Sequence, residues 1–492
     1  FFALSVALGN PFIGSLIFAI GIIVANVPEG LLPTVTLALT MASKRMAKKN
    51  ALIKNLEAVE TLGSTTVICT DKTGTITQNR MKVATLVLGE REWSADQSGL
   101  AQEEGFADAW AVMALCNNAR LTDHHYQGDP TEGALLLLAQ SLQPIGDLAA
   151  RFPRVHESPF DSATRRMITT HKTGNGQPNL AYMKGAPEIV LKKCTHRLHR
   201  GERVEFDDSA RGKALALYEV LAARGERVLA LACKTTDADA ASEEDFVYLG
   251  LVGMLDPPRP EIAEAIDRCR SAGIRVFMIT GDYHTTAESI ARQVGLFTGD
   301  GQVVVGEDLL QTSEQELSVL LDSRELVFAR STPQQKLQIV TALQKKGEVV
   351  TVTGDGVNDS PALKNANMGV AMGVSGTEVA REAADMVLMD DNFASIVQAI
   401  EEGRTIFSNI KKFIAYILTS NVPEILPFIA FVAIDAPLAL TVVLILTIDL
   451  GTDILPALGL GRELPEEDVM KQAPRRRDER LLTWPLLAMS YG

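Results

Sequence analysis

The segment 69–75, Cys-Thr-Asp-Lys-Thr-Gly-Thr, carries the side chains needed for acyl-phosphate chemistry. The apolar run at 66–69, before Asp71, predicts a buried strand, and Gly74 between hydroxyl side chains predicts a loop at the carboxyl end of that strand. Ligands bind at this end of an open α/β sheet. A carboxylate in such a loop can attack a phosphoryl group and hold it as an aspartyl-phosphate. The alternative interpretation is that Asp71 only caps a helix.

Two later loops repeat this arrangement. The strand predicted at 274–279 is followed by a Thr-Gly-Asp loop at 280–282, and the strand predicted at 348–352 is followed by a second one within 353–360. Lys336 lies between them in the sequence. Carboxylates grouped beside a phosphate require a counter-ion, and Mg²⁺ is the hard cation that prefers oxygen ligands. For any single loop, the alternative is an ordinary turn at the end of a strand.

The DKTGT stretch that begins at Asp71 resembles the phosphorylation motif of P-type ATPases, and the later loops follow in the order of that family. The resemblance implies that Asp71 is phosphorylated, and that Asp71, Asp355 and the carbonyl group of Thr73 bind Mg²⁺. It also implies that further residues hold the transferred phosphoryl group or assist its transfer: Thr280, Gly281, Asp282, Lys336, Asn358 and Asp359.

Thr73 distinguishes this sequence from related phosphatases. Phosphatases of the haloacid dehalogenase type carry a D-x-D motif at the corresponding position. The second carboxylate of that motif acts as a general acid and then as a base for water attack. Thr73 stands at that second position. Because this base is missing, the acyl-phosphate should survive longer, which suits a pump that couples phosphorylation to a change of shape.

The segment 81–255 lacks long apolar spans and alternates short strand-like and helix-like runs, which predicts a soluble insert. Its stretches 128–132, 159–161 and 184–188 resemble, in this order, the nucleotide-binding domain of P-type pumps. An aromatic face for adenine and cationic side chains for phosphate suit ATP. The resemblance places five residues in an ATP pocket: Glu132, Phe160, Arg165, Lys184 and Arg227. Arg165 stands where relatives of the sodium/potassium pump usually have lysine.

An apolar run near the beginning of the sequence is long enough to span a bilayer, which takes about 20 residues. Between positions 11 and 43 the only charged residue is Glu29, and the neighbouring Pro28 frees carbonyl groups one turn upstream. An ionisable residue beside unwound backbone inside a membrane predicts an ion site. The alternative is a proline kink in which Glu29 is a buried, neutral hydrogen-bond donor. Basic residues at 44–49 predict a cytoplasmic exit.

A second apolar region follows near the end of the sequence. The pattern turns helical near Glu401, and two spans are predicted at 413–432 and 438–460. The basic pair 411–412 precedes the first span and the basic cluster 475–477 follows the second. Two crossings with a short turn place these basic groups on one side of the membrane, together with the first cluster.

Polar side chains inside the predicted spans form a group rich in oxygen. Ser420 and Asn421 lie four and three residues before Glu424, and Asp449 and Asp453 are four residues apart, so each set shares a helix face. Such carboxylates form a cage for desolvated cations, and the alternative is that neutral carboxyl groups pair with one another. The predicted residues of the cation site are Val24, Ala25, Val27, Glu29, Ser420, Asn421, Glu424, Asp449 and Asp453.

The stretches 24–31, 419–424 and 449–453 resemble the sodium/potassium branch of P-type ATPases. Heavy-metal pumps carry a C-P-C motif or a similar one in the kinked helix. This sequence has no cysteine in the corresponding stretch 24–31, and so no thiolate for a soft metal. Gastric-type proton/potassium pumps carry lysine at the position of Ser420, and reticulum-type calcium pumps have asparagine at that of Asp449. The resemblance favours exchange of monovalent cations, with calcium transport as the alternative.

The predicted fold is a multidomain α/β chain with membrane helices. It contains a haloacid dehalogenase-like (Rossmannoid) phosphorylation domain, an inserted α+β nucleotide-binding domain and transmembrane helical segments. The predicted boundaries are 1–45 for the first membrane segment, 46–80 and 256–405 for the phosphorylation domain, 81–255 for the nucleotide-binding domain, 406–461 for a transmembrane hairpin, and 462–492 for a cytoplasmic loop and the start of a helix.

The composition excludes several classes of function. The 492 residues carry a net charge of −14 and no basic stripe with interleaved aromatic residues, so nucleic-acid binding is not expected. The five cysteines form no C-x-x-C pair, so neither a zinc site nor a disulfide framework is indicated. We expect them to be reduced thiols in the cytosol. The sequence starts and ends inside apolar runs and has no T-G-E-S motif, whose glutamate activates water in the family. We therefore expect a piece of a longer protein that lacks the actuator domain.

These observations favour an integral protein of the plasma membrane with cytoplasmic catalytic domains. It would use ATP and Mg²⁺ to transport cations across the lipid bilayer, with an accessory subunit left unknown. A calcium pump, a membrane-tethered phosphatase of the haloacid dehalogenase type and a catalytically silent relative are the alternatives.

Overall fold

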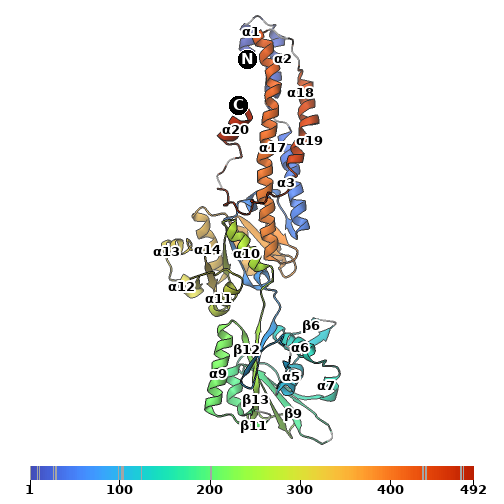
Figure 1. The fold of residues 1–492 in the computed structure, drawn as a ribbon, viewed down its shortest axis with the longest axis vertical. Coiled ribbons are helices and arrows are strands. Elements are labelled where there is room, and N and C mark those ends of the chain that lie inside the picture. Colours follow the sequence, from blue (N-terminus) through green and yellow to red (C-terminus); the bar gives the residue numbers. More distant parts are fainter. Residues whose placement is uncertain are drawn as a thin grey trace.

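The computed structural model is elongated, with a bundle of helices at one end and two α/β units stacked along the axis below it (Figure 1). It describes residues 2–7, 9, 11–25, 27, 30–97, 99–100, 103, 105–122, 125–174, 176–199, 202–434, 437, 440–476, 479 and 481–491. The middle unit is built on an eight-stranded sheet and the lower unit on a nine-stranded one.

The eight-stranded sheet is mainly parallel and buried on both faces. Its order is β1 (Ala51–Ile53), β19 (Met386–Leu388), β18 (Met368–Met372), β17 (Val350–Gly354), β2 (Val67–Thr70), β14 (Arg275–Ile279), β16 (Leu326–Ala329) and β15 (Gln302–Val305). Its strands read as near-continuous apolar runs, as expected for parallel strands covered by helices. The strands predicted at 66–69, 274–279 and 348–352 are confirmed as β2, β14 and β17, each within two residues.

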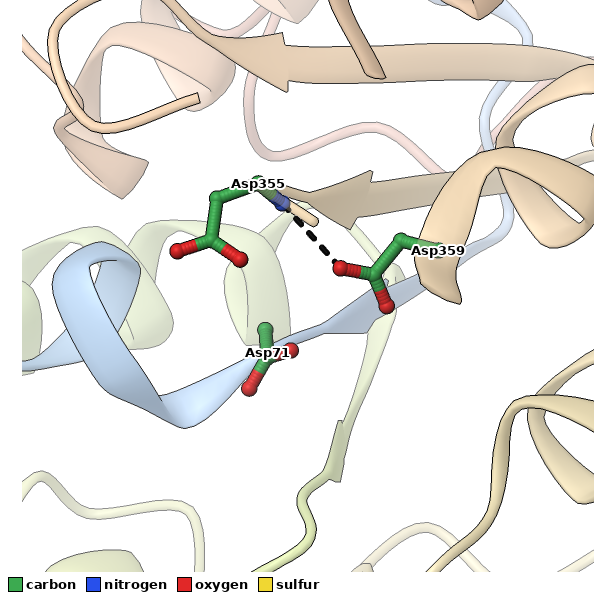
Figure 2. Close-up of side chains that lie close together, drawn as sticks. All are labelled: Asp71, Asp355 and Asp359. Atoms are coloured by element: carbon green, nitrogen blue, oxygen red, sulfur yellow. Dashed lines mark hydrogen bonds between the residues drawn. The ribbon is translucent and has the colours of Figure 1, made fainter. Parts of the chain in front are cut away.

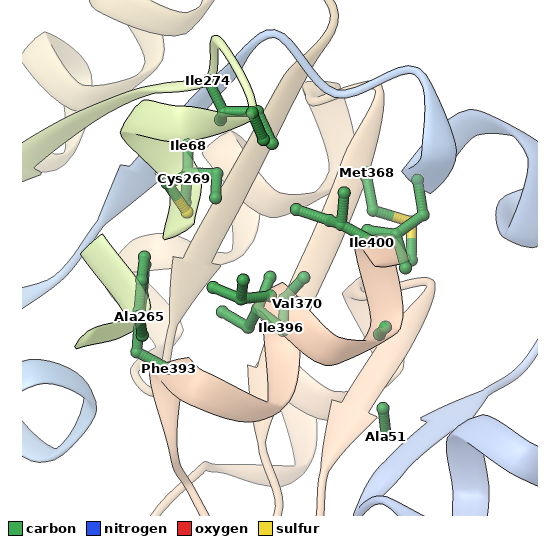
Figure 3. Packing of buried hydrophobic residues seen from close by; sticks show 14 of the residues in the cluster. Ala51, Ile68, Ala265, Cys269, Ile274, Met368, Val370, Phe393, Ile396 and Ile400 are labelled. Atoms are coloured by element: carbon green, nitrogen blue, oxygen red, sulfur yellow. The ribbon is translucent and has the colours of Figure 1, made fainter. Parts of the chain in front are cut away.

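Helices cover this sheet on both faces. They are α4 (Leu56–Gly63), α10 (Ile262–Ser271), α11 (His284–Gln293), α12 (Gly306–Leu309), α13 (Glu314–Leu320), α14 (Pro333–Lys345), α15 (Ser360–Asn365) and α16 (Glu378–Ala383). Alternate residues of β2 enter opposite cores, Ile68 on one side and Cys69 on the other. The first core also receives Phe393, Ile396 and Ile400 from a long helix, as Figure 3 shows.

The nine-stranded sheet forms the lower unit. The path is β11 (Glu202–Glu205), β10 (Cys194–His199), β13 (Phe246–Leu255), β12 (Arg227–Thr236), β9 (Asn179–Gly185), β8 (Arg166–His171) and β7 (Arg154–Ser158), with β3 (Lys82–Leu88) on β13 and β4 (Arg91–Ser94) on β3. Its other elements are α5 (Phe106–Leu115), β5 (Arg120–Thr122), β6 (His125–Gln127), α6 (Pro130–Leu142), α7 (Leu148–Arg151), α8 (Pro187–Val190), η3 (Leu191–Lys193) and α9 (Asp208–Ala223).

The two units are joined by two chain segments that run side by side. Thr77 forms a β-bridge with Pro258, and the backbone N–H of Arg80 donates to Oδ1 of Asp256 at 3.0 Å. Proline fixes the backbone and excludes helix, so the proline-rich stretch at 256–260 forms a stiff connection here.

The upper helices differ from the prediction in two ways. They are α1 (Phe2–Ala7), α2 (Phe12–Ala25), α3 (Leu31–Lys48), α17 (Phe393–Ile434), α18 (Val442–Ile448), η5 (Asp449–Asp453), α19 (Ile454–Leu460) and α20 (Trp484–Tyr491). The crossing predicted within 11–43 consists of two helices, and α2, at 14 residues, is about 21 Å long. Among the described residues, two helical stretches are long and apolar enough to cross a membrane, Phe393–Ala430 and Val442–Leu460.

The second difference is the length of α17. It begins at Phe393, so the helical onset predicted near Glu401 was wrong by eight residues. The reason is that its first turns pack on the eight-stranded sheet before the helix reaches the apolar span. Its 42 residues extend about 63 Å from the sheet into the helix bundle.

Close contacts tie the sheet to the bundle. The carboxylate of Glu402 on α17 is buried and accepts from Arg45 Nε at 2.8 Å and from Lys49 Nζ at 3.0 Å. A Cβ on Gly63 would lie 2.5 Å from the carbonyl carbon of Gly403, so α4 and α17 meet backbone to backbone. α4 leads directly into β2, and α3, α4 and α17 contribute side chains to the same hydrophobic core as Ile68 of β2.

Candidate functional site

Asp71 lies at the carboxyl end of β2, where the neighbouring strand β17 also ends. Its backbone N–H donates to Oγ1 of Thr353 at 2.9 Å, and its Oδ1 accepts from the N–H of Lys72 at 2.6 Å. The loop that follows turns sharply at Gly74, whose φ of +76° suits glycine. Asp71 therefore points out of the sheet edge from a backbone fixed on both sides, and it caps the turn only through Lys72.

Lys336 neutralises part of the charge around Asp71. It comes from α14, is 4% exposed, and its Nζ lies 3.2 Å from Asp71 Oδ2 and 2.7 Å from Asp359 Oδ1. The other oxygen of Asp359 accepts from the N–H groups of Asp355 and Gly356 at 3.2 and 3.1 Å. Burial alone would lower the pKa of Lys336, but the two carboxylates outweigh it and hold the pKa above its ordinary value. Lys336 is therefore a permanent cation.

Three carboxylates converge at this point, as Figure 2 shows. Oxygen atoms of Asp71, Asp355 and Asp359 all lie within 4.8 Å of one another. Burial, followed by the charges of Asp71 and Asp359, raises the pKa of Asp355. With one lysine against three carboxylates, the group carries an excess of negative charge that an oxygen-liganded divalent cation would offset. This donor set fits Mg²⁺.

The loop after β14 completes the surroundings of Asp71. Asp282 forms an ion pair with the buried Nζ of Lys72, and the adjacent Thr280 is 3% exposed. Gly281 and Asn358 are exposed in the loops beside the carboxylates, where a ligand can reach them. The structure therefore brings the loops at 71–75, 280–282 and 355–359 to one edge of the sheet, as the sequence predicted.

Sequence reasoning did not single out two residues that orient this site. Thr353 accepts the N–H of Asp71, and Arg259 donates through Nη2 to the carbonyl of Gly74 at 3.1 Å. Thr353 belongs to a Thr-Gly-Asp loop whose repetition was recognised, so its position carried a signal. Arg259 lies in the proline-rich stretch, which was interpreted only as a hinge.

Three of the five residues predicted for the ATP pocket, Glu132, Lys184 and Arg227, lie close to one another. Lys184 on β9 is 5% exposed and pairs with Glu132 Oε1 at 2.7 Å, at the start of α6. Arg227 donates to Thr131 Oγ1 at 3.2 Å, so it lies beside the same first turn of α6. Asp129 caps α6 through the N–H groups of Thr131 and Glu132, which confirms the helix predicted after Gly128.

The other two predicted ATP residues lie on the turn between β7 and β8. Phe160 is 63% exposed, so its ring is accessible for stacking against a ligand. Arg165 forms an ion pair with Glu188 at 2.8 Å. Among the described side chains, it forms no hydrogen bond or ion pair with the other four residues predicted for ATP. Its backbone φ is +49°.

A second group of carboxylates lies inside the helix bundle. Oxygen atoms of Glu424 on α17 and of Asp449 and Asp453 on η5 lie within 4.8 Å of one another. Glu424 and Asp449 are 4% and 5% exposed. Asn421 Oδ1 and Asp453 Oδ2 are buried and accept no hydrogen bond from the described part of the chain. Buried acceptors of this kind suit a cation, which supplies the missing positive charge.

The other residues predicted for this cation site are not part of the carboxylate cluster. Ser420 Oγ donates to the carbonyl of Ile417 at 2.9 Å, so its hydrogen is directed along its own helix. The N–H of Val27 donates to the carbonyl of Val24 at 3.1 Å, in the interruption between α2 and α3. Glu29 lies outside the described residues, as does the side chain of Ala25.

Comparison with known proteins places these features in one family. Family models match the chain as "P-type ATPase, cytoplasmic domain N" over 106–261, as a haloacid dehalogenase-like hydrolase over 335–400, and as "Cation transporting ATPase, C-terminus" over 437–492. They confirm the predicted fold class.

Individual relatives match across the whole chain. It is 43% identical over 550 residues to the sodium/potassium-transporting ATPase subunit alpha-4 of Rattus norvegicus, and 44% identical over 551 residues to subunit alpha-2 of Gallus gallus. It is 43% identical over 553 residues to the alpha subunit of Hydra vulgaris. All of this chain is covered in each case, but only 53% or 54% of each relative, so the chain spans about half their length. The chain belongs to the P-type ATPases, and the relatives that match it from end to end are of the sodium/potassium-transporting type.

Proposed function

We propose that the protein containing this chain uses ATP to move monovalent cations of the sodium/potassium type across a membrane, through an aspartyl-phosphate at Asp71. The observation that carries the proposal is the pairing of Lys336 with both Asp71 and Asp359 beside Asp355. In-line phosphoryl transfer needs mainly positioning and neutralisation of charge, and this arrangement provides both.

The chemistry follows from these positions. An oxygen of Asp71 attacks the γ-phosphorus of ATP, the bond to the β-phosphate oxygen breaks, and ADP leaves. Lys336 balances the charge on Asp71 and on the transferred group. Mg²⁺ held by Asp71, Asp355 and the Thr73 carbonyl would offset the charge of the phosphates. In this proposal Gly281 and Asn358 donate to the phosphoryl oxygens, and Asp282 holds Lys72 through their ion pair.

Coupling to transport is proposed through α17. This helix begins in the core beneath β2 and carries Glu424 in the bundle. The proposed cation ligands are Glu424, Asn421, Asp449 and Asp453, with Val24 and Val27 near the end of α2. In this proposal, rearrangement at Asp71 reaches the cage through the hydrophobic core that β2 shares with α3 and α17, which contains Ile68, Met46 and Phe393.

The proposal includes the domain limits predicted above, cytoplasmic catalytic units, and location in the plasma membrane. Relatives that match the whole chain are sodium/potassium-transporting ATPases, which favours monovalent cations over calcium. Thr73, in place of a second carboxylate, disfavours a phosphatase.

ATPase activity of the membrane-embedded protein, titrated separately with Na⁺, K⁺ and Ca²⁺, tests the proposed function. We expect stimulation by Na⁺ and K⁺. Stimulation by Ca²⁺ alone would replace the monovalent assignment with a calcium pump, and phosphatase activity indifferent to every cation would replace transport itself.

Glu424→Gln should raise the cation concentration that half-activates ATPase activity by at least about tenfold. The change removes one of three clustered charges while keeping the shape of the side chain, and a unit charge a few ångströms from a cation contributes several kcal/mol at a low effective dielectric. Glu314→Gln, at an exposed ion pair with Lys345, is the matched control and should have no effect. Unchanged cation dependence in Glu424→Gln would exclude this cluster from transport.

Lys184→Gln should weaken ATP binding roughly 10- to 100-fold, because a buried cation that contacts phosphate contributes about 1.5–3 kcal/mol. Binding is measured by displacement of a fluorescent ATP analogue. Lys193→Gln, which breaks an ion pair with exposed Glu244 in the same unit, is the control. Equal affinities of Lys184→Gln and the unmodified protein would place the ATP pocket elsewhere.

A further inference from the structure

Asp391 is a buried carboxylate outside the group around Asp71. It follows β19, is 5% exposed, and its backbone φ of +53° lies in the left-handed region. Its Oδ1 accepts from the N–H of Val374 at 2.9 Å, and its Oδ2 accepts from the N–H of Ser375 at 2.7 Å. Hydrogen bonds to a carboxylate are among the stronger ones in proteins. The side chain of Asp391 therefore holds the backbone of the segment after β18.

That segment, the loop 373–377, depends on Asp391 at its tip. The side chain of Val374 is 75% exposed and that of Ser375 is exposed as well, so packing of side chains does not hold this part of the loop. The N–H of Gly373 donates to a backbone carbonyl of β19 at 2.8 Å, which fixes the start of the loop. Asp391 holds the two residues that follow.

This loop lies between two segments that are proposed to bind Mg²⁺. On one side, the N–H of Thr377 donates to the carbonyl of Asp355 at 2.8 Å. On the other side, a Cβ on Gly74 would lie 3.6 Å from Oγ of Ser375, and Gly74 directly follows Thr73. The position of the loop is therefore linked to the positions of both segments.

The backbone of Asp355 is held at both of its polar groups. Its N–H donates to Oδ2 of Asp359 at 3.2 Å, and its carbonyl accepts from Thr377. Figure 2 shows the carboxylate of Asp355 beside Asp71. Mg²⁺ demands near-ideal octahedral geometry, and residues that orient a metal ligand typically contribute roughly 10- to 100-fold to the metal affinity. Loss of a contact that holds Asp355 should therefore weaken binding of the ion.

We propose that Asp391 is a positioning residue of the Mg²⁺ site: it fixes the loop 373–377, and this loop holds Asp355 in the place where it binds the ion. The inference rests on the proposed function, which places Mg²⁺ beside Asp71. Asp391 acts through the backbone of the loop and is not part of the carboxylate group at Asp71. The competing explanation is that Asp391 only stabilises a turn, and the two explanations differ in the expected affinity for Mg²⁺.

Asp390 provides the matched control, because it is adjacent, has the same chemistry and contacts other segments. Its Oδ2 accepts from Nδ2 of Asn50 at 3.0 Å and from Oγ of Ser395 at 2.8 Å. Asn50 precedes β1, and Ser395 lies in the first turn of α17. Asp390 therefore holds the start of α17 and not the loop 373–377.

The test measures Mg²⁺ binding by the full-length protein in a calorimeter, without ATP. The part of the binding that Asp355→Asn abolishes defines the site. We expect Asp391→Asn to weaken this part about tenfold, because an amide nitrogen replaces one of the two accepting oxygens. Asparagine keeps the size of the side chain and tolerates the left-handed backbone. Asp390→Asn should bind Mg²⁺ as the unmodified protein does.

Two further measurements separate the loop from the reaction. In hydrogen–deuterium exchange without Mg²⁺, the amides of 374–377 should exchange faster in Asp391→Asn than in the unmodified protein. Labelling of Asp391→Asn from γ-labelled ATP should persist at saturating Mg²⁺, because Asp71 and Lys336 are unchanged, and its loss at every Mg²⁺ concentration would contradict a role limited to the ion. Absence of label from the unmodified protein would refute the proposed function, and the calorimetric measurements would still decide the inference.

Thr377 offers a second pair of variants that leaves Asp391 unchanged. The φ of Thr377 is −69°, which proline adopts, so Thr377→Pro removes the N–H that donates to Asp355. Thr377→Ala keeps this N–H, and both changes remove the hydroxyl group that caps α16. We expect Thr377→Pro to weaken Mg²⁺ binding more than Thr377→Ala does. The difference between the two variants isolates the contact with Asp355.

Four outcomes of the binding measurements would overturn the inference. Normal Mg²⁺ affinity in Asp391→Asn, with or without faster exchange, would show that Asp391 only stabilises the turn. An equal loss in Asp390→Asn would show a general effect of removing a charge. Equal affinities of Thr377→Pro and Thr377→Ala would show that the loop does not act through Asp355. Mg²⁺ binding that Asp355→Asn leaves unchanged would remove the site itself.

Discussion

Asp71→Asn abolishes acid-stable labelling of the protein from γ-labelled ATP. Replacing one oxygen of the side chain by an amide nitrogen removes the nucleophile, and loss of a covalent nucleophile costs roughly 10⁴-fold or more in rate. The change is nearly isosteric, and Lys336 keeps its 2.7 Å contact with Asp359. We therefore expect a folded protein without detectable phosphoenzyme, measured after an acid quench on a denaturing gel.

ATP binding provides the internal control for this variant. Oxygens of Asp71, Asp355 and Asp359 lie within 4.8 Å of one another, so the γ-phosphate approaches an already negative group. Removing one charge lowers this repulsion, and ATP affinity should be equal or higher. Asp282→Asn, which breaks the ion pair with Lys72 but keeps Asp71, should still label. Label on Asp71→Asn would place the acyl-phosphate on another residue.

The loops of the phosphoryl site could be predicted from the sequence because each follows a short apolar strand. In a parallel sheet, the carboxyl ends of neighbouring strands meet at one edge, and because the structure makes β2 and β17 neighbours, Asp71 and Asp355 lie close together. The contact of Lys336 with Asp359 could not be derived in this way. Lys336 reaches the edge from the second turn of α14, and its position depends on how that helix packs over the sheet.

In the helix bundle, local spacing was a good guide to which carboxylates meet but not to the backbone that carries them. The i, i+4 rule placed Asp449 and Asp453 on one face of an α-helix, whereas they lie on a π-turn flanked by α18 and α19. Such turns are common at functional sites. The length of α17 was underestimated because its first residues, from Phe393, are apolar for packing on the sheet and not for contact with lipid. Local hydropathy does not separate these two reasons.

Lys336→Met should reduce the rate of phosphoenzyme formation roughly 10²- to 10³-fold. Methionine has a similar length and fills the same space, so the change removes the cation while leaving little cavity. The oxygens of Asp71 and of the transferred phosphoryl group then lack their protein cation. Rapid-quench measurement of labelling at saturating ATP separates this effect from binding. Lys345→Met is the matched control on the same helix, at an exposed ion pair with Glu314, and should label at the normal rate.

A second effect of Lys336→Met distinguishes its catalytic role from its structural one. Breaking a buried ion pair leaves Asp359 with an uncompensated charge and typically costs about 3–5 kcal/mol, so the midpoint of thermal unfolding should fall. Adding Asp359→Asn removes that charge and should restore much of the stability. It should not restore labelling, because the cation beside Asp71 is still missing. If the double variant regained both, Lys336 would only support the fold, and the cation that assists transfer would have to come from elsewhere.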